Sequence, residues 1–480
     1  MRFLQPKDTE KHWDLVVIGS GFGSLFFVHK YLARRPKDQV LILEWGRHNT
    51  VNWQFENRAN SEIPPEVTYR DKGVRKKWDF TIGLGGSTNS WWALSPRMHP
   101  ADFRLQSLYG KGVDWPVSYD DLVPYYSEAE EIMTVAGPDD LGSVYPHSVG
   151  YPQPPHRLTT VDRLVKAAMP DAHFAIPSAR LSRPLGSRGS CCSDASCNLC
   201  PTGAKYTALE GMTSLLSHPN VSICVEARVR RLEVQAGAVH SATFTSGDRD
   251  HETRGDLFVL GANAIHSPFI LQQSGLGGGV VGRYLGEKLL AIAEAKLDGL
   301  QHFDGGTGTT AINVSRLDGP HRRERGSAVF LFENNFRYFG LRLEHGRWRE
   351  ILPIVIYIED VLQKDSGVFD EGGEFPVVRF AGFSDYAING LNGAVAALPE
   401  ILKPLPVDDI QFRTILPTLG HVQGTLRMGT SAENSVVDGG QVHHRIRNLV
   451  VVGTSVFPTT GSANIALTAA ALSLRAADRL

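Results

Sequence analysis

The first forty-five residues most constrain what this chain can fold into. An apolar run at residues 14–18 ends in the glycine-rich turn GSGFGS at residues 19–24. A segment with helical spacing follows, and a second apolar run occupies residues 40–43. This order predicts a strand, a tight turn, a helix and a second strand, which is the unit that opens a doubly wound sheet. We therefore predict an α/β domain of Rossmann type at this end.

The glycine-rich turn also has the features of a dinucleotide-binding site. Gly19 permits the tight turn, and Gly21 lets a pyrophosphate approach the backbone at the helix N-terminus. Ser24 stands where a third glycine is usual, with Gly23 just before it. Glu44 ends the second strand, where a carboxylate accepts hydrogen bonds from ribose hydroxyls. A fortuitous glycine turn is the alternative interpretation, and the motif does not separate NAD from FAD.

The length of 480 residues is too great for one ordinary hydrophobic core, so more than one domain is expected. The C-terminus returns to the pattern of the N-terminus, with a buried run at 448–453 and a small-residue helix at about 464–480. Residues 291–419 carry the alternating apolar patterns of an antiparallel sheet. Residues 109–185 are rich in Pro, Tyr and Asp, and Asp120 or Asp121 could cap a helix there.

We therefore predict two domains in an α/β fold that is α+β overall. The FAD- or NAD-binding domain takes residues 1–108, 186–290 and 420–480, and includes strands within 221–234 and 257–260. A substrate-binding domain with a largely antiparallel sheet takes residues 109–185 and 291–419. The polar segment 52–78 lacks clean periodicity and is expected to run over the surface.

Charge and hydropathy exclude several classes of protein. The 49 Lys and Arg against 51 Asp and Glu give a net charge of -2, so no basic field is present to hold nucleic acid or anionic lipid. No apolar stretch approaches the ~18 residues of a transmembrane helix. The first fourteen residues lack the apolar core of a signal peptide, which predicts a cytoplasmic location.

Several ordered motifs resemble those of the glucose-methanol-choline (GMC) family of FAD-dependent oxidoreductases, in particular its sugar dehydrogenase and pyranose oxidase-like branches. The matching segments are GSGFGS with Glu44, GGSTNSWWALSPR, DWPVSYDDLVPYY, CPTGAK, GANAIHSPFILQQSG, HVQGTLRMG and NLVVVGTSVFPTTGSANIALTAAALSLRAAD. The resemblance implies FAD rather than NAD. It also implies further cofactor contacts, from Gly85, Gly86, Ser87, Asn89, Val229 and Ser455. Some relatives attach the flavin to a histidine where this chain has Ser90, so we expect non-covalent FAD.

The same resemblance implies a catalytic pair. His421, at the start of HVQGTLRMG, matches the family base, and Asn464 matches the second catalytic position. An alcohol oxidation needs a base within hydrogen-bond reach of the substrate hydroxyl. The structural alternatives are a hydrogen-bonded loop histidine and an asparagine that caps a helix. Ile465 replaces the proline that often follows this asparagine, and His443 and His444 are expected in a solvated turn.

Four cysteines fall within ten residues, which favours a metal or redox site over a disulfide framework. The spacing of Cys192, Cys197 and Cys200 before Pro201 is similar to iron-sulfur loops, with Cys191 as an alternate to Cys192. Three thiolates suit a [3Fe-4S] cluster better than zinc, which takes four ligands. A local disulfide, free thiols or zinc are the alternatives. The fifth cysteine, Cys224, is expected in the core.

Together these features predict FAD-dependent oxidation of a CH–OH group of a sugar, glycoside or polyol, by hydride transfer to flavin N5. With an iron-sulfur cluster, the enzyme would be a dehydrogenase that passes electrons to a protein or a quinone. Related dehydrogenases have a small accessory subunit that carries the export signal, so a periplasmic location is the alternative. An oxygen-using oxidase without a cluster and a non-catalytic electron-transfer subunit are the competing functions.

Overall fold

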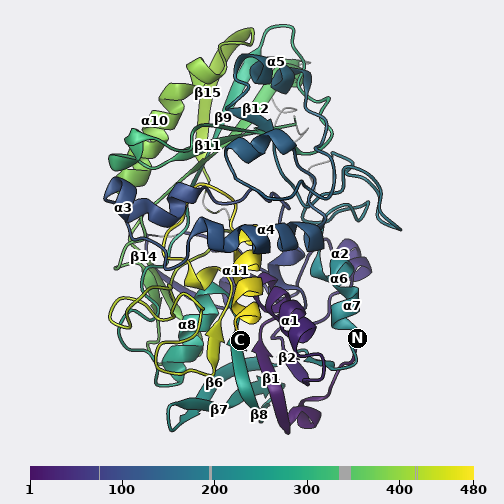
Figure 1. Cartoon of the computed structure of the whole chain (residues 1–480), viewed down its shortest axis with the longest axis vertical. Coiled ribbons are helices and arrows are strands. Elements are labelled where there is room, and N and C mark those ends of the chain that lie inside the picture. Colours follow the sequence, from purple (N-terminus) through teal and green to yellow (C-terminus); the bar gives the residue numbers. More distant parts are fainter. Residues whose placement is uncertain (75, 194–196, 335–346, 417, 419) are drawn as a thin grey trace.

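The computed structural model describes residues 1–74, 76–193, 197–334, 347–416, 418 and 420–480. The molecule is elongated, and two tiers of structure are stacked along its longest axis (Figure 1). The lower tier contains both chain termini and a sheet built around β1 (His12–Ile18). The upper tier contains a second sheet, covered by α10 (Asp385–Ile401). The α/β fold predicted from the sequence is confirmed.

The lower tier is a seven-stranded sheet of order β5-β2-β1-β8-β7-β6, with β16 paired to β8. β1, β2, β5, β16 and the second half of β8 are parallel, and α1 connects β1 to β2. β8 begins before the predicted residue 257 because its first half pairs with the antiparallel β7. The other elements of this tier are α1 (Phe22–Arg34), β2 (Val40–Leu43), β5 (Val221–Cys224), β6 (Arg228–Gln235), β7 (Ala238–Ser246), β8 (Arg249–Leu260) and β16 (Leu449–Val451).

Two further helices cover this sheet. α11 (Ala466–Asp478) packs against α1, and α4 (Tyr119–Met133) packs across α11. Most of α11 is buried, because its alanines let the neighbouring helices approach closely. The expected aspartate cap of α4 is wrong. The Ser118 hydroxyl accepts from the Asp121 amide and the Asp121 carboxylate accepts from the Ser118 amide, so the two residues form a capping box.

The upper tier is a six-stranded antiparallel sheet of order β15-β9-β12-β11-β10-β4, as the alternating sequence patterns predicted. One face packs on α10 and α5 through alternate residues such as Ala291, Ile354 and Phe330. The intervening residues, such as Leu290 and Tyr357, face the lower tier. The bounds are β4 (His173–Ala175), β9 (Leu289–Leu297), β10 (Thr309–Arg316), β11 (Ala328–Glu333), β12 (Ile351–Ile358), β15 (Val407–Ile415) and α5 (Thr160–Ala168).

A small three-stranded sheet lies beside the larger ones, in the order β13-β14-β3. The segment 52–78, which was expected only to cross the surface, contributes the strand β3 to this sheet. The same segment also forms most of the helix α2 and a short 3-10 turn. The remaining described elements are η1 (Pro6–Thr9), α2 (Val51–Asn57), η2 (Pro65–Val67), β3 (Arg70–Gly73), η3 (Gly86–Thr88), η4 (Pro100–Arg104), α3 (Leu105–Tyr109), η5 (Asp139–Ser143), α6 (Ala208–Gly211), α7 (Thr213–Leu216), α8 (Asn263–Gln273), η6 (Pro320–Arg323), η7 (Arg347–Glu350), β13 (Gly367–Phe369), β14 (Val377–Phe380) and η8 (Thr454–Val456).

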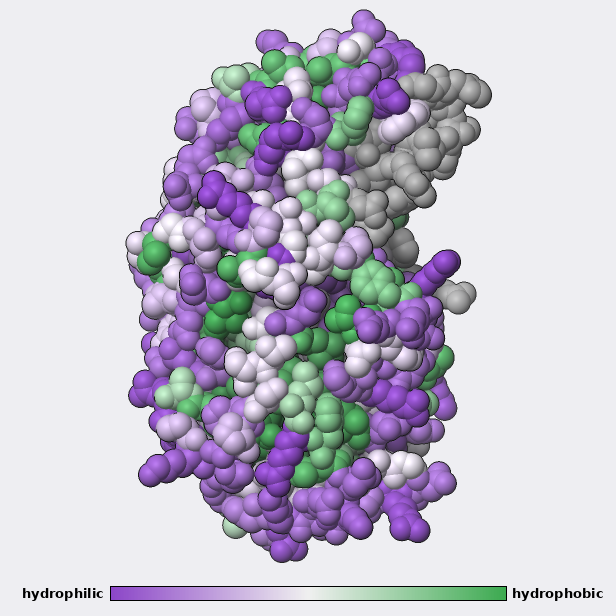
Figure 2. Space-filling model, turned by 90° about the vertical axis from the view of Figure 1, so that its right-hand side faces the viewer, coloured by the Kyte–Doolittle hydropathy of each residue, from purple (hydrophilic) through white to green (hydrophobic). Residues whose placement is uncertain are grey.

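The chain passes between the tiers several times. The lower sheet takes its strands from residues 12–43, 221–260 and 449–451, and the upper sheet takes them from 173–175 and 289–415. The exact domain boundaries stay a prediction. Within the described part of the chain, no helix combines the length and the apolar composition needed to cross a membrane. The face in Figure 2 is largely hydrophilic, with apolar side chains gathered over its middle and lower half.

Candidate active site

One large cavity, of about 1020 Å³, is lined by residues from both sheets. The lower sheet contributes the glycine-rich turn and the ends of β1, β2 and β16, and the upper sheet contributes side chains of β9, β11 and β12. The carboxyl ends of parallel strands are where α/β sheets bind their ligands. Nine of the predicted site residues line this cavity: Gly19, Gly21, Gly23, Glu44, Gly86, Ser87, Val229, His421 and Asn464.

The glycine-rich turn leaves space in front of the helix α1. Gly19 has a φ of 89°, which favours glycine, and a Cβ added at Gly21 would meet no protein atom within 4 Å. Among the described residues, no side chain caps the first N–H groups of α1, so they are open to an anionic ligand. The Glu44 carboxylate is buried beside them, and burial raises its pKa. The turn therefore fits the pyrophosphate and ribose of a dinucleotide.

Gly23, rather than Ser24, takes the packing role of the third glycine. A Cβ at Gly23 would lie 2.5 Å from the backbone nitrogen of Gly453, so only glycine lets α1 approach the end of β16. The Ser24 hydroxyl is buried against Gly261 and has no hydrogen-bond partner among the described residues. Ser24 is not among the residues that line the cavity, so the predicted cofactor contact of its side chain has no support in the structure.

The second glycine segment lies against the first. A Cβ at Gly86 would come within 2.9 Å of the Gly21 Cα, so the two glycine turns are in close contact. Ser87 and Ser90 line the cavity, and the Ser90 hydroxyl is 2.6 Å from that of Thr81. These contacts place both turns on the same ligand-binding surface.

Three other predicted contacts lie behind this surface. Gly85, with a φ of 93°, starts the turn η3, and the Asn89 amide donates to the Leu84 carbonyl at 2.9 Å. The Ser455 hydroxyl is fully buried without a partner in the described structure. None of the three lines the cavity, so they support the turn and the loop that do.

His421 and Asn464 meet in the cavity although they lie 43 positions apart in the chain. Tyr357, from the cavity face of β12, also lines the cavity. Its ring centroid is 5.9 Å from that of His421, and the Asn464 side chain acts on its hydroxyl in the direction that lowers its pKa. Burial raises the pKa of Tyr357, so its hydroxyl stays protonated and available as a donor.

The surroundings of His421 keep its imidazole neutral. Burial lowers its pKa well below the usual value, and the nearby Lys288 ammonium lowers it further. Its Nδ1 atom has no hydrogen-bond partner among the described residues. Its backbone N–H donates to Glu287 at 2.7 Å, and Glu287 also pairs with the buried Lys76. A neutral imidazole held by its backbone is suited to accept a proton.

Asn464 is not a helix cap, so that alternative is wrong. The N-cap residue of α11 is Ile465, and no side chain caps the helix. The Asn464 side chain lines the cavity instead. Ile465, directly after the asparagine, lines the cavity with it.

The loop before Asn464 is fixed from the opposite side by buried polar groups. The Thr460 hydroxyl accepts from the Asp360 amide and donates to the Asp360 carbonyl, both at 2.9 Å. The Ser462 hydroxyl is 3.2 Å from that of Ser327. The buried Lys288 ammonium donates to the carbonyl of Ala463, the residue next to Asn464. These bonds limit the positions that Asn464 can take.

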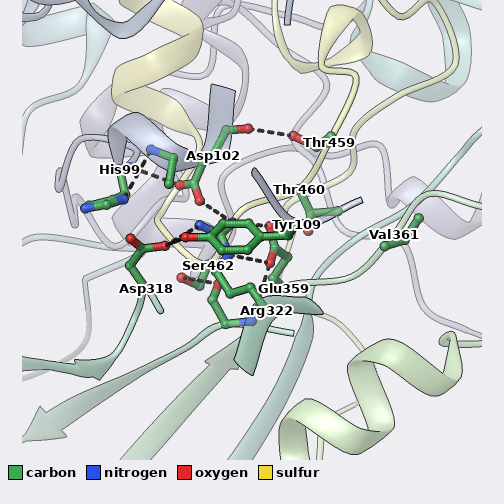
Figure 3. Close-up of polar contacts among 12 residues, drawn as sticks. His99, Asp102, Tyr109, Asp318, Arg322, Glu359, Val361, Thr459, Thr460 and Ser462 are labelled. Atoms are coloured by element: carbon green, nitrogen blue, oxygen red, sulfur yellow. Dashed lines mark hydrogen bonds and ion pairs between the residues drawn. The ribbon is translucent and has the colours of Figure 1, made fainter. Parts of the chain in front are cut away.

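A buried ion cluster anchors this loop to the upper tier. Arg322 lies between the carboxylates of Asp102 and Glu359, at 2.7 Å from each, and all three side chains are fully buried (Figure 3). The Thr459 hydroxyl bonds to the backbone of Asp102 at 3.5 Å. Removing one member of a buried ion cluster leaves an uncompensated charge, which typically costs about 3–5 kcal/mol. The cluster therefore joins η4, η6 and β12 to the loop that carries Asn464.

The cysteine segment at residues 191–200 is the predicted iron-sulfur site, and its residues 194–196 lie outside the described structure. Within the described ranges, no three His, Cys, Asp or Glu side chains are arranged to hold a metal ion, so the structure gives the predicted cluster no support. Cys191, Cys197 and Cys200 are thiols, and each sulfur has another partner. These partners are Thr307 for Cys191, Arg180 for Cys197, and the Lys205 backbone with Thr202 for Cys200. Cys192 is exposed whereas Cys197 is buried, so the predicted ligands lie in different environments.

Two smaller expectations have clear outcomes. Cys224 is fully buried in β5, as expected of a core residue. His443 is not solvated, because it is buried and its Nδ1 accepts from the backbone of Arg445 and Ile446. Burial lowers the pKa of His443 to about 4, which keeps it neutral in this structural role.

Sequence reasoning missed several cavity residues. Tyr357 and Lys288 belong to no recognisable sequence motif. Tyr357 lies within the apolar strand β12, and Lys288 directly precedes the first apolar residues of β9. Trp45, Arg228 and His266 line the cavity near Val229, and the Arg228 guanidinium lies 4.5 Å from the Trp45 ring centre. For these residues, the only indication in the sequence of a place in the cavity was that Arg228 directly precedes Val229, a predicted cofactor contact.

A dinucleotide-binding α/β sheet, joined through one cavity to a histidine–asparagine pair, defines a flavin-dependent oxidoreductase. Residues 75–290 and 403–473 match the N-terminal and C-terminal models of the GMC oxidoreductases. The chain belongs to this family of FAD-dependent enzymes, which oxidise alcohol groups.

Relatives and solved structures agree with this assignment. The fructose dehydrogenase large subunit of Gluconobacter japonicus is 27% identical over 97% of each chain. The 6'''-hydroxyparomomycin C oxidase of Streptomyces lividus is 28% identical, over 98% of this chain and 92% of the oxidase. The crystal structure of pyridoxine 4-oxidase from Mesorbium loti superposes with a TM-score of 0.67 at 18% identity, covering 97% of this chain and 99% of that one. At that identity the structural likeness shows the fold alone.

Proposed function

We propose that this chain oxidises a CH–OH group of a sugar, glycoside or polyol, with His421 as the base and Asn464 as its partner. The observation that carries the proposal is the convergence of His421, Asn464 and Tyr357 on the cavity that the glycine turns also line. The fructose dehydrogenase subunit and the hydroxyparomomycin oxidase among its relatives favour a sugar or glycoside as substrate.

The residues that line the cavity fit FAD. The open space before Gly21 and the uncapped start of α1 suit the pyrophosphate, and Glu44 suits the adenosine ribose. Ser90 has a hydroxyl where a covalent link would need an imidazole, so the cofactor is held without a covalent bond. When bound, FAD supplies the acceptor for a hydride at its N5 atom.

The chain's own residues handle the proton. The neutral imidazole of His421 accepts the proton of the substrate hydroxyl. The Asn464 amide, which lines the cavity with the Tyr357 hydroxyl, holds the substrate oxygen without competing as a base. The apolar side chains of Leu290, Ile292 and Val355, on the same sheet face, exclude water from this end of the cavity.

Anaerobic spectroscopy tests the proposal. The purified protein should show flavin absorbance that acid precipitation releases from the polypeptide, and mixing with a panel of sugars, glycosides and polyols should bleach it. A protein without flavin, or a flavin that no alcohol reduces, would end the proposal. This test separates the enzyme from a non-catalytic electron-transfer subunit. In such a subunit, the flavin would stay oxidised when an alcohol is added.

The same preparation tests how the reduced flavin is reoxidised. That the enzyme is a dehydrogenase rather than an oxidase stays a prediction. Reoxidation by a quinone much faster than by oxygen would support a dehydrogenase, whereas stoichiometric hydrogen peroxide would identify an oxidase. Iron analysis after anaerobic purification tests the cluster independently. The accessory subunit and the acceptor protein also stay predictions.

A further inference from the structure

Two adjacent charged residues contact the two halves of the catalytic pair. Glu287 and Lys288 directly precede β9, and each is only 1% exposed. The Glu287 carboxylate accepts from the backbone N–H of His421 at 2.7 Å. The Lys288 ammonium donates to the carbonyl of Ala463, the residue before Asn464. One short stretch of chain therefore bonds the backbone beside both side chains of the proposed reaction.

Backbone pairing keeps this stretch in register with the segment that begins at His421. The Gly286 N–H donates to the Gln423 carbonyl at 3.1 Å, and the Gln423 N–H donates back to the Gly286 carbonyl at 3.0 Å. This bridge brings the side chain of the next residue, Glu287, to the backbone of His421. The strand that follows places Leu290 opposite Tyr357, and both line the cavity.

Lys76 anchors Glu287 from a distant part of the chain. Its ammonium pairs with the Glu287 carboxylate, and both side chains are buried. The same ammonium lies 4.4 Å from the ring centre of Trp78, and residues 79–82, which follow, line the cavity. The Thr418 hydroxyl also donates to the carboxylate, at 3.5 Å. Because the Lys76 ammonium compensates its charge, a carboxylate is tolerated here and accepts a strong hydrogen bond.

The position of His421 matters because two transfers must happen together. The imidazole has to meet the substrate hydroxyl while the carbon of the same CH–OH group faces the cofactor, and a misplacement of about 1 Å can cost about 10²-fold in rate. The His421 Nδ1 atom has no hydrogen-bond partner among the described residues. The bond from its backbone to Glu287 therefore contributes directly to its placement.

We propose that Glu287 is a positioning residue, which holds the backbone of His421 at the distance from Asn464 that the reaction needs. Lys76 compensates the charge of Glu287, and Lys288 holds the loop that carries Asn464. This inference rests on the proposed function, in which His421 is the base, and it adds the group that sets where the base lies.

The test compares two holoenzymes that carry the same charge and differ in the acceptor at position 287. Lys76→Met with Glu287→Gln removes both charges and keeps a side-chain carbonyl for the His421 N–H. Lys76→Met with Glu287→Leu removes both charges and the acceptor. Replacing both members of a buried ion pair avoids the cost of leaving one charge alone.

Anaerobic stopped-flow absorbance, with the most reactive alcohol of the panel, gives the limiting rate of flavin reduction and the dissociation constant of the substrate. The leucine variant should have a limiting rate about 10- to 100-fold below that of the glutamine variant, since its base is displaced. Its flavin content and its substrate dissociation constant should match those of the glutamine variant within about twofold, because the loss concerns the transition state.

A second acceptor-poor variant covers the case in which the leucine variant does not fold. Lys76→Met with Glu287→Met places a flexible side chain without a strong acceptor at position 287. It should show the same loss in the limiting rate as the leucine variant.

The same exchanges in a His421→Ala background show whether the effect passes through the histidine. There the glutamine and leucine variants should differ by less than about twofold, because the group that is displaced is absent. A general loss of folding would slow flavin reduction in both backgrounds.

Glu294 and Arg413 provide a matched control. They form an ion pair between β9 and β15, at 2.6 Å, and neither lines the cavity. Glu294→Gln and Glu294→Leu, each combined with Arg413→Met, should give limiting rates within about twofold of each other, since neither contacts the catalytic pair.

Two results would overturn the inference. One is an equal limiting rate in the glutamine variant and in the folded acceptor-poor variants at position 287. The other is a loss of the same size with and without His421. In both cases, reduction of the wild-type flavin by alcohols leaves the proposed function standing. A wild-type flavin that no alcohol reduces would remove the proposed function and this inference together.

Discussion

At the residue scale, the candidate site depends on keeping one histidine neutral and one asparagine in place. His421 is buried beside a lysine, and both features lower its pKa. The HVQGTLRMG motif identified this histidine, but its protonation state follows from Lys288, which lies 133 positions earlier in the chain. Long-range neighbours of this kind leave no local pattern in a sequence.

Replacing His421 with alanine tests its role as the base. Flavin reduction by a saturating substrate should slow by about 10²–10⁴-fold, the range typical of a lost general base, while the flavin content stays that of wild type. Stopped-flow absorbance under anaerobic conditions measures both. His444→Ala is the control, because His444 bonds Ser435 and does not line the cavity. A wild-type rate in His421→Ala would exclude the histidine as the base.

The pH dependence of flavin reduction tests the coupling between Lys288 and His421. Burial lowers the pKa of Lys288 to about 7, so below that pH it is protonated and disfavours an imidazolium at His421. Lys288→Met removes this charge and should raise the pKa of His421. The acid limb of the rate profile should therefore move to higher pH, whereas Lys288→Arg should leave it in place. An unmoved limb in Lys288→Met would contradict the coupling.

At the scale of elements, the strand–turn–helix unit at the N-terminus separates two uses of glycine. Gly21 leaves space for a ligand, whereas Gly23 lets α1 contact the backbone that follows β16. The sequence showed a run of glycines but could not assign these different uses. The distinction depends on Gly453, which comes from the other end of the chain.

Alanine at each position should separate these uses. Gly21→Ala should lower the free energy of unfolding of the apoprotein by less than about 1 kcal/mol, since its Cβ meets open space at a helix N-cap. It should weaken FAD binding strongly. Gly23→Ala should cost about 1–3 kcal/mol, because its Cβ would lie 2.5 Å from the Gly453 nitrogen.

Urea denaturation of the apoprotein and titration with FAD, followed by flavin fluorescence, measure these two effects. Equal losses of stability in the two variants would contradict the assignment. So would undiminished FAD affinity in Gly21→Ala.

The cysteine segment and the helix caps show what patterns within a single element leave open. Cysteine spacing is a one-dimensional signal, and it does not fix the direction of each sulfur. Here Arg180 and Thr307, both outside the loop, are the partners of Cys197 and Cys191.

Helix caps show a similar ambiguity, since an acidic residue near a helix start can serve as the cap or as the N3 member of a capping box. Asp121 takes the second role, because Ser118 precedes it by three residues.

At the scale of the whole molecule, one cavity unites two sheets that the sequence could describe only separately. The parallel sheet was predictable because short apolar runs, glycine turns and helical periodicity are local patterns set by backbone sterics. The antiparallel sheet was predictable from alternation. The side chains that meet between the sheets could not be predicted, since Tyr357, for example, is a single polar residue in an apolar strand.

The sequence by itself determined the class of fold, and it predicted the dinucleotide-binding turn and the candidate pair His421 and Asn464, because each lies in a motif of contiguous residues. Only the tertiary structure decided that Asn464 faces the cavity rather than capping α11. It also decided which groups set the charge of His421. These properties depend on burial and on contacts between distant segments, and both exist only once the chain has folded.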